Sequence, residues 1–117
     1  MGKMKQFMMQ DIEGNEELMN GFAEFQFEQA LEHIFLKGTA LLVQKHKDYG
    51  PKNIAQSPGG PLNGLRVRMW DKLARINHLI DSGATPENES LRDSFIDLMN
   101  YSAIAVMVLD GDWPGTD

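Results

Sequence analysis

Acidic side chains recur at every fourth position in the stretch ESLRDSFIDLMNYSAIAVMVLDG, residues 89–111. On a helix, residues at this spacing lie one above the other, so Glu89, Asp93 and Asp97 form a line of carboxylates that leads to Asn100. Carboxylate and amide oxygens are hard ligands that suit magnesium or manganese. The spacing therefore indicates a candidate metal site at Glu89, Asp93 and Asp97.

The same acids also have a purely structural explanation. Glu89 and Asp93 lie near the start of the expected helix, where the positive end of the helix dipole favours carboxylates. Asp97 lies where the polar part of the stretch gives way to an apolar run, so its charge needs a cation. That cation is either a bound metal or an Arg or Lys from the preceding helix, and Asp97 can also simply pair with Arg75 or Arg92. Both explanations remain open.

A cluster of basic residues precedes the acids. Arg66, Arg68, Lys72 and Arg75 lie within ten positions of each other, in a chain that has 11 basic residues in total. The formal net charge of −6 argues against a broad surface for duplex nucleic acid. A local basic cluster in an acidic protein can still hold the phosphates of a small molecule. Such a cluster can serve a polyphosphate.

The segment DYGPKNIAQSPGGPLNG, residues 48–64, is rich in glycine and proline and predicts a long loop. Loops of this length in small domains are often lids or binding loops, although many are only connections. Backbone amides of a glycine turn can meet phosphate oxygens, and Tyr49 can stack on a base. Lys47, Lys52 and Asn53 add basic and polar groups around this turn.

Helices are expected to position all of these residues. Apolar spacing predicts a first helix over 22–47, in which Gly38 could introduce a kink, and a second over 65–80. A third helix begins after either Thr85 or Ser90 and ends near residue 110. Its expected apolar face comprises Leu91, Phe95, Leu98, Ser102, Ala105 and Leu109. No strand pattern competes anywhere in the chain.

A chain of 117 residues predicts a single domain. We divide it into an N-terminal arm (1–21) that is mobile or partner-dependent, a helical domain (22–112) and a tail (113–117). The expected fold class is all-α: a small helical bundle with a long Gly/Pro-rich loop between its first two core helices. Such a bundle barely closes a core, so we expect a homo-oligomer to complete it.

The chain has no cysteine, no signal-peptide pattern and no apolar run of the ~20 residues that a membrane span requires. We therefore expect a cytoplasmic protein without a membrane partner.

Three segments together resemble a known family: KHKDYGPKNI, LRVRMWDKLARINHLI and ESLRDSFIDLMNYSAIAVMVL. They are similar to the nucleotide modification associated domain of phages and bacteria. That short helical domain has a Lys-x-x-Asp-Tyr-Gly turn, an Asp-Lys-x-x-Arg helix and a Glu-Ser-x-x-Asp-x-x-x-Asp helix. The resemblance covers about residues 40–110, and it implies a nucleotide-handling protein of bacteria or of phage-infected host cells.

A more distant resemblance is to the all-α NTP pyrophosphohydrolases of the MazG and dCTPase type, in which acids on two packed helices hold magnesium. Asp93 and Asp97 match the acidic pair of the later helix in those enzymes. Asp71 stands where their earlier helix presents a Glu-x-x-Glu pair. Here that pair is replaced by Asp71 with Lys72 and Arg75, and bases at these positions suit phosphate binding without hydrolysis.

Two nucleotide-related functions follow from this resemblance. The first is a metal-dependent nucleoside triphosphate pyrophosphohydrolase, with Asp71, Asp93 and Asp97 as catalytic residues and Mg²⁺ or Mn²⁺ on Glu89, Asp93 and Asp97. The second is a non-catalytic module that sequesters a nucleotide or a nucleotide-derived signal. In either case, the expected ligand-binding residues are Lys47, Tyr49, Lys52, Asn53, Arg68, Lys72, Arg75 and Asn100. A helical adaptor with an acidic face for a protein partner is a third possibility.

Overall fold

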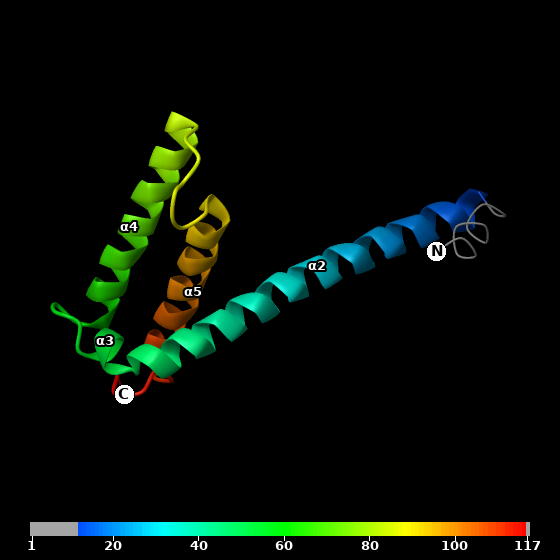
Figure 1. Ribbon diagram of the computed structural model, residues 1–117. Helices are drawn as coiled ribbons and strands as arrows, with labels where there is room; N and C mark the ends of the chain where they lie inside the picture. Colours follow the sequence, from blue (N-terminus) through cyan, green and yellow to red (C-terminus); the bar gives the residue numbers. More distant parts are fainter. Residues whose placement is uncertain (1–11, 117) are drawn as a thin grey trace. The chain divides into compact units, whose positions relative to one another are not determined.

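The computed structural model of the protein describes residues 12–116. Its helices are α2 (Ile12–Tyr49), α3 (Lys52–Ala55), α4 (Pro61–Ser82) and α5 (Leu91–Leu109) (Figure 1). Residues 12–116 contain no strand, so the all-α prediction is confirmed. None of the helices in this range is long and apolar enough to cross a membrane. The chain divides into two compact units at Lys37/Gly38, and each is described by itself.

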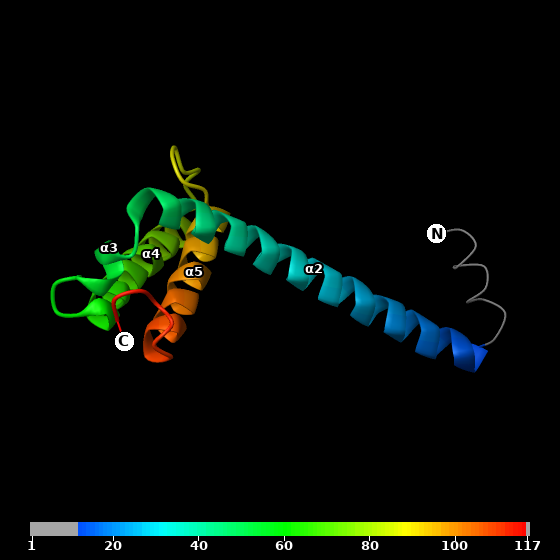
Figure 2. The ribbon, with the colours of Figure 1, turned by 90° about the horizontal axis from the view of Figure 1, so that it is seen from below.

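Helices α4 and α5 form the antiparallel pair at the centre of the second unit, and they lie side by side in both views (Figures 1 and 2). Local signals set their ends. Pro61 occupies the first turn of α4, where its missing N–H costs nothing. Gly83 ends α4 in the left-handed conformation, with φ of 64°. A capping box between Ser90 and Asp93 begins α5, so the later of the two predicted starts is confirmed.

Helix α2 is longer than the sequence predicted. It begins at Ile12 instead of residue 22, and it continues through Gly38 to Tyr49. The sequence of residues 12–21 has no sustained apolar period, so periodicity gave no signal for them. The remainder of the predicted N-terminal arm, residues 1–11, lies outside the described residues.

Gly38 explains how closely α2 approaches α5. It is buried, and its carbonyl accepts a hydrogen bond of 3.1 Å from Nδ2 of Asn100. A Cβ atom at this position would overlap the side chain of Met99. Glycine therefore allows the two backbones to come together, and it does not interrupt the helix, an outcome that the sequence had left open.

A small apolar core lies between the last turns of α2, helices α3, α4 and α5, and the C-terminal segment. Its buried members are Ile54, Leu65, Ile104, Val108 and Trp113. The connection between α2 and α4, residues 50–60, contributes to this core through the four-residue helix α3. The sequence assigned Trp113 to the tail, whereas the structure places its ring at 5% exposure within the core.

The buried face of α5 differs from the predicted one. Phe95 and Leu109, expected in the core, are 50% and 70% exposed. The buried residues of α5 are instead Ser94, Asp97, Asn100, Ile104 and Val108. The N-terminal half of this face is polar. Its side chains can be buried because they form hydrogen bonds or ion pairs with groups on α2 and α4, and these replace the interactions lost with water. A rule that places only apolar residues inside misses such a face.

The first unit consists of the N-terminal part of α2. Large apolar side chains along it are exposed, among them Phe25 at 56%, Phe27 at 67% and Leu36 at 68%. Exposed apolar side chains in this number are uncommon on a protein that stays alone in water.

Candidate functional site

Lys72 of α4 stands between two carboxylates. Its Nζ lies 2.9 Å from both carboxylate oxygens of Glu89 and 2.8 Å from Oδ2 of Asp97. The sequence left open whether a metal or a base neutralises Asp97, and the structure places lysine there. A base from the preceding helix was one of the predicted alternatives, and Lys72 on α4 is such a base. Lys45 on α2 is a second partner, whereas neither Arg75 nor Arg92 pairs with Asp97 among the described residues.

Asp97 is the most enclosed of the predicted acids, with a side-chain exposure of 10%. Its other oxygen, Oδ1, accepts a hydrogen bond of 3.0 Å from Nζ of Lys45 on α2. Burial alone would raise the pKa of Asp97, but the hydrogen bonds from the two lysines outweigh it and the pKa lies below 3.8. Burial would lower the pKa of Lys72, yet Asp97 and Glu89 raise it above 10.5. Both groups are therefore charged at neutral pH.

Arg75 fixes the start of α5 against α4. It donates a hydrogen bond of 3.0 Å to Oγ of Ser94 and a second one to the backbone carbonyl of Glu89. Ser94 is fully buried, and this bond satisfies its hydroxyl. Arg75 thus positions the acids of the network, although the sequence predicted that it binds ligand.

The remaining predicted acids lie apart from this network. Oδ2 of Asp93 accepts a hydrogen bond of 3.3 Å from the backbone N–H of Ser90, which completes the capping box. Asp71 is exposed on α4 and has no ion pair with any residue in 12–116. Within that range, no three His, Asp or Glu side chains lie close enough to hold a metal ion. The carboxylates of Glu89 and Asp97 surround an ammonium group, so their arrangement does not fit a metal.

Substitution of Asp97 tests this network through its pH dependence. We expect Asp97→Asn to lower the free energy of unfolding by about 1–2 kcal/mol at neutral pH, because two charge-assisted hydrogen bonds are weakened. The folded-state pKa of Asp97 lies below 3.8. Its contribution is therefore complete above that pH and is lost as the pH falls through the lowered pKa. Urea unfolding across the acid range should show the two proteins converging below 3.8; a constant difference would mean that the charge of Asp97 is not what matters.

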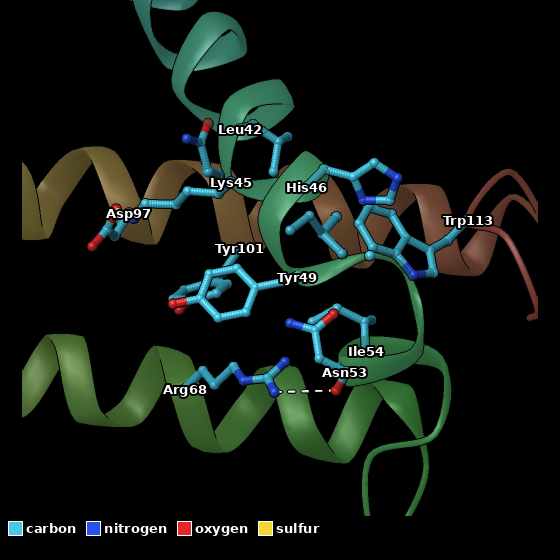
Figure 3. Close-up of a pocket in the computed structure, with 13 residues that line it drawn as sticks. Leu42, Lys45, His46, Tyr49, Asn53, Ile54, Arg68, Asp97, Tyr101 and Trp113 are labelled. Atoms are coloured by element: carbon cyan, nitrogen blue, oxygen red, sulfur yellow. Dashed lines mark hydrogen bonds and ion pairs between the residues drawn. The ribbon is translucent and has the colours of Figure 1, made fainter.

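A pocket opens beside this network, within the second unit. It has a volume of about 240 Å³ and is lined from α2, α3, α4, α5 and the C-terminal segment (Figure 3). Its polar lining comprises Lys45, His46, Tyr49, Asn53, Arg68, Asp97, Asn100 and Tyr101. Its remaining walls are Leu42, Gly50, Ile54, Ile104 and Trp113. Pockets that mix apolar walls with a few polar groups are typical of small-molecule sites.

The structure brings five of the predicted site residues to this pocket: Tyr49, Asn53, Arg68, Asp97 and Asn100. Lys47 and Lys52 are exposed and do not line it. Lys72, Arg75 and Glu89 belong to the adjacent network of ion pairs. Asp97 belongs to this network and also lines the pocket. The predicted ligand-binding set therefore splits into pocket residues and residues that hold the pocket wall.

Polar atoms without partners mark one side of the pocket. Nη2 of Arg68 donates to the backbone carbonyl of Asn53 over 3.1 Å, as Figure 3 shows. Nη1 of Arg68 is buried and has no hydrogen-bond partner among residues 12–116, and neither has Nδ1 of His46. Unpaired buried polar atoms cost free energy and are commonly satisfied by bound water or by a ligand, and both residues line the pocket.

Sequence reasoning did not assign His46 or Trp113 to the site. Their rings meet edge to face, with centroids 5.0 Å apart and an interplanar angle of 75°. The indole Nε1 of Trp113 donates to the carbonyl of Pro51 over 3.1 Å. Trp113 therefore holds His46 and the turn after α2 in place. No local pattern around Trp113 could have shown this, because Pro51 lies 62 residues away in the sequence and His46 lies further still.

Comparison with known proteins identifies a family for this chain. Residues 45–109 match the family described as nucleotide modification associated domain 1. The match spans the last turn of α2, the connection with α3, helix α4 and helix α5, and it includes most of the pocket lining. No curated protein and no solved structure matches the chain. The predicted family is confirmed, and the distant similarity to MazG-type enzymes stays a prediction.

Proposed function

Because this chain belongs to the nucleotide modification associated domain 1 family, we propose that it binds a nucleotide in the pocket between α2, α4 and α5. The main support is the pair of buried, unpaired polar atoms, Arg68 Nη1 and His46 Nδ1, in the pocket wall. Two tyrosines, Tyr49 and Tyr101, offer flat rings for a base. The protein acts on the nucleotide pool of a bacterial cell or of a phage-infected host.

Binding without chemistry is the form of this proposal that the charges favour. Lys72 already neutralises Glu89 and Asp97, and Asp93 serves as a helix cap. A ligand can therefore enter the pocket without any rearrangement of the acidic residues. The protein then holds its nucleotide intact, as a module that sequesters a nucleotide or a nucleotide-derived signal.

Magnesium-dependent hydrolysis of a nucleoside triphosphate is the second candidate. The observation in its favour is that Asp97, one of the predicted catalytic acids, reaches the pocket. It requires Lys72 to leave the carboxylates of Glu89 and Asp97 so that oxygen ligands become available. It also requires the exposed Asp71 and the capping residue Asp93 to turn toward the same point.

One experiment separates the two candidates. Purified protein is incubated with a panel of nucleotides, with magnesium and with EDTA, and both turnover and retained ligand are followed by chromatography. Sequestration predicts that ligand is retained in either condition and released intact on denaturation. Turnover that disappears with EDTA would establish the hydrolase instead. If no nucleotide is bound or converted, the proposal fails.

Tyr49→Ala tests the location of the binding site without disturbing the fold. The Tyr49 side chain is 69% exposed, so we expect the free energy of unfolding to change by less than about 0.5 kcal/mol. Loss of base stacking should weaken nucleotide binding by about 1–3 kcal/mol, measured by isothermal titration calorimetry. Phe95→Ala, which removes a 50% exposed ring on α5 outside the pocket lining, is the matched control. Equal effects of the two variants would place the nucleotide elsewhere.

We further propose that the chain associates with a second copy of itself. Exposed apolar side chains occur in both units, for example Phe27 and Leu36 in the first and Val67, Trp70 and Val106 in the second. The exposed apolar residues of one copy can therefore pack against those of a second copy.

The oligomeric state tests this association. Light scattering coupled to size-exclusion chromatography should give the mass of a dimer or a larger assembly. The double variant Phe27→Glu, Leu36→Glu should give a monomer, because a charge cannot be buried unpaired in an apolar contact. A wild-type monomer at high protein concentration would refute the proposal.

A further inference from the structure

The charges of the pocket limit what kind of nucleotide it accepts. Two cationic side chains line it, Lys45 and Arg68, and one carboxylate does, Asp97. Lys45 lies 3.0 Å from Oδ1 of Asp97 and is paired with it. Among residues 12–116, Arg68 has no carboxylate partner: its one hydrogen bond goes to the neutral carbonyl of Asn53. The lining contributed by these residues therefore has a single cation whose charge is not compensated.

Arg68 is suited to one oxyanion. The guanidinium is always charged, and it donates through a planar fork that matches phosphate or carboxylate oxygens. Nη2 is held by Asn53, which fixes the orientation of the fork, while Nη1 remains buried and unpaired. A phosphate oxygen beside the guanidinium would neutralise its charge, and it reaches Nη1 once the atoms that cover Nη1 move aside.

Further phosphates find no comparable partner in the pocket. Beyond Arg68, the charged groups of the site and of the adjacent network are Lys45, Lys72, Arg75, Glu89 and Asp97, and each of them pairs within that network. A second phosphate directed toward this network would have to compete with the carboxylate of Asp97 for Lys45, the cation of the network that lines the pocket. A second phosphate directed to solvent would gain little, because exposed charges are screened.

We infer that the pocket selects a nucleotide with a single phosphate, and that Arg68 is the residue that recognises it. This inference rests on the proposed nucleotide binding and makes it more specific: the ligand class is a nucleoside monophosphate rather than the triphosphate that a pyrophosphohydrolase would require. Binding of this ligand does not depend on a divalent cation, since Arg68 supplies the positive charge.

A phosphate series on each base provides the test. Adenosine, guanosine, cytidine, uridine and thymidine are titrated by calorimetry as the nucleoside, the monophosphate, the diphosphate and the triphosphate, each with EDTA and with magnesium. For the preferred base, the monophosphate should bind about 10- to 100-fold more tightly than the nucleoside, the contribution of one charge-assisted contact. The diphosphate and triphosphate should bind no more tightly than the monophosphate, and magnesium should change neither result.

The variant Arg68→Gln tests whether Arg68 is the residue that recognises the phosphate. In this variant the monophosphate should bind only as well as the nucleoside, while the affinity for the nucleoside itself is retained. Retained nucleoside binding also shows that the variant is folded. Arg66→Gln is the matched control, because Arg66 is exposed on the same helix, bonds only to Asn63 among the described residues and does not line the pocket.

The outcomes separate this inference from the proposed function. If no nucleoside or nucleotide binds, nucleotide binding itself is refuted. If nucleosides bind but the phosphate adds nothing, or if the triphosphate binds tenfold more tightly than the monophosphate, the pocket binds nucleotides and the single-phosphate inference is wrong. Dependence of the monophosphate on magnesium would also overturn it, because a cation would then be supplying the charge assigned to Arg68.

Discussion

Trp113→Ala is expected to lower the free energy of unfolding by about 3–5 kcal/mol, a large part of the stability of a domain of this size. The ring is 5% exposed, packs in the core cluster and donates to the carbonyl of Pro51. Truncation leaves a cavity and an acceptor without its donor. It also removes the ring that holds His46, so nucleotide binding should weaken as well. Urea unfolding followed by circular dichroism, together with calorimetric titration, measures both effects.

The second tryptophan of the chain is the control, measured in the Phe27→Glu, Leu36→Glu background so that self-association does not contribute. Trp70 lies on α4 and is 63% exposed, so Trp70→Ala should change the free energy of unfolding by less than about 0.5 kcal/mol in that background. Similar losses for the two variants would show that the C-terminal segment is not packed in the core as described. Unchanged stability in Trp113→Ala would lead to the same conclusion.

Local signals made much of the fold predictable from the sequence. Pro61, Gly83 and the Ser90 capping box determine where α4 and α5 begin or end, and each acts within a few residues of itself. The position of Trp113 could not be predicted in this way, because its burial depends on Pro51, which is 62 residues distant. Periodicity records which face of a helix is apolar, and it is silent about a single residue in an irregular segment.

The sequence predicted several residues of the candidate site, but it did not predict which of their side chains pair with each other. Tyr49, Asn53 and Arg68 could be selected because their residue types suit phosphates and bases, and the structure brings them to one pocket. Nothing in the spacing indicated that Lys45, 52 residues from Asp97 in the chain, would pair with it. Pairing between helices follows from how they pack, and packing was the part of the argument that a single sequence did not determine.

The acids at the start of α5 show that spacing can also group residues that the structure separates. Equal spacing suggested that Glu89, Asp93 and Asp97 act together, but they have three different surroundings. Asp93 caps the helix, Glu89 precedes the helix and pairs with Lys72, and Asp97 is buried between two lysines. A line of charges on a helix becomes a metal site only when the neighbouring elements leave room for the ion.

Gly64→Ala is expected to destabilise the protein by an amount near the upper end of the ~1–3 kcal/mol typical of overpacking. Gly64 lies in α4, and a Cβ atom there would overlap both Oγ and Cβ of Ser57. Ser57 cannot yield easily, because it is 9% exposed and its hydroxyl donates to the carbonyl of Asn53 over 2.7 Å. The segment that carries Asn53 and Ile54 must therefore move away from α4, which also disturbs one wall of the pocket. Urea unfolding measures the loss of stability.

Gly21→Ala serves as the control, because we expect it to raise the free energy of unfolding instead of lowering it. Gly21 lies within α2, and among the described residues nothing comes within 4 Å of the position that a Cβ atom would take there. Alanine should therefore stabilise this helix by up to about 1 kcal/mol through its higher helix propensity. Adding Ser57→Gly to Gly64→Ala removes the overlapping atoms and should restore part of the lost stability. If Gly64→Ala proves as stable as the wild type, the close contact between α4 and Ser57 does not exist. If the double variant is no more stable than Gly64→Ala alone, the loss has another cause than this overlap.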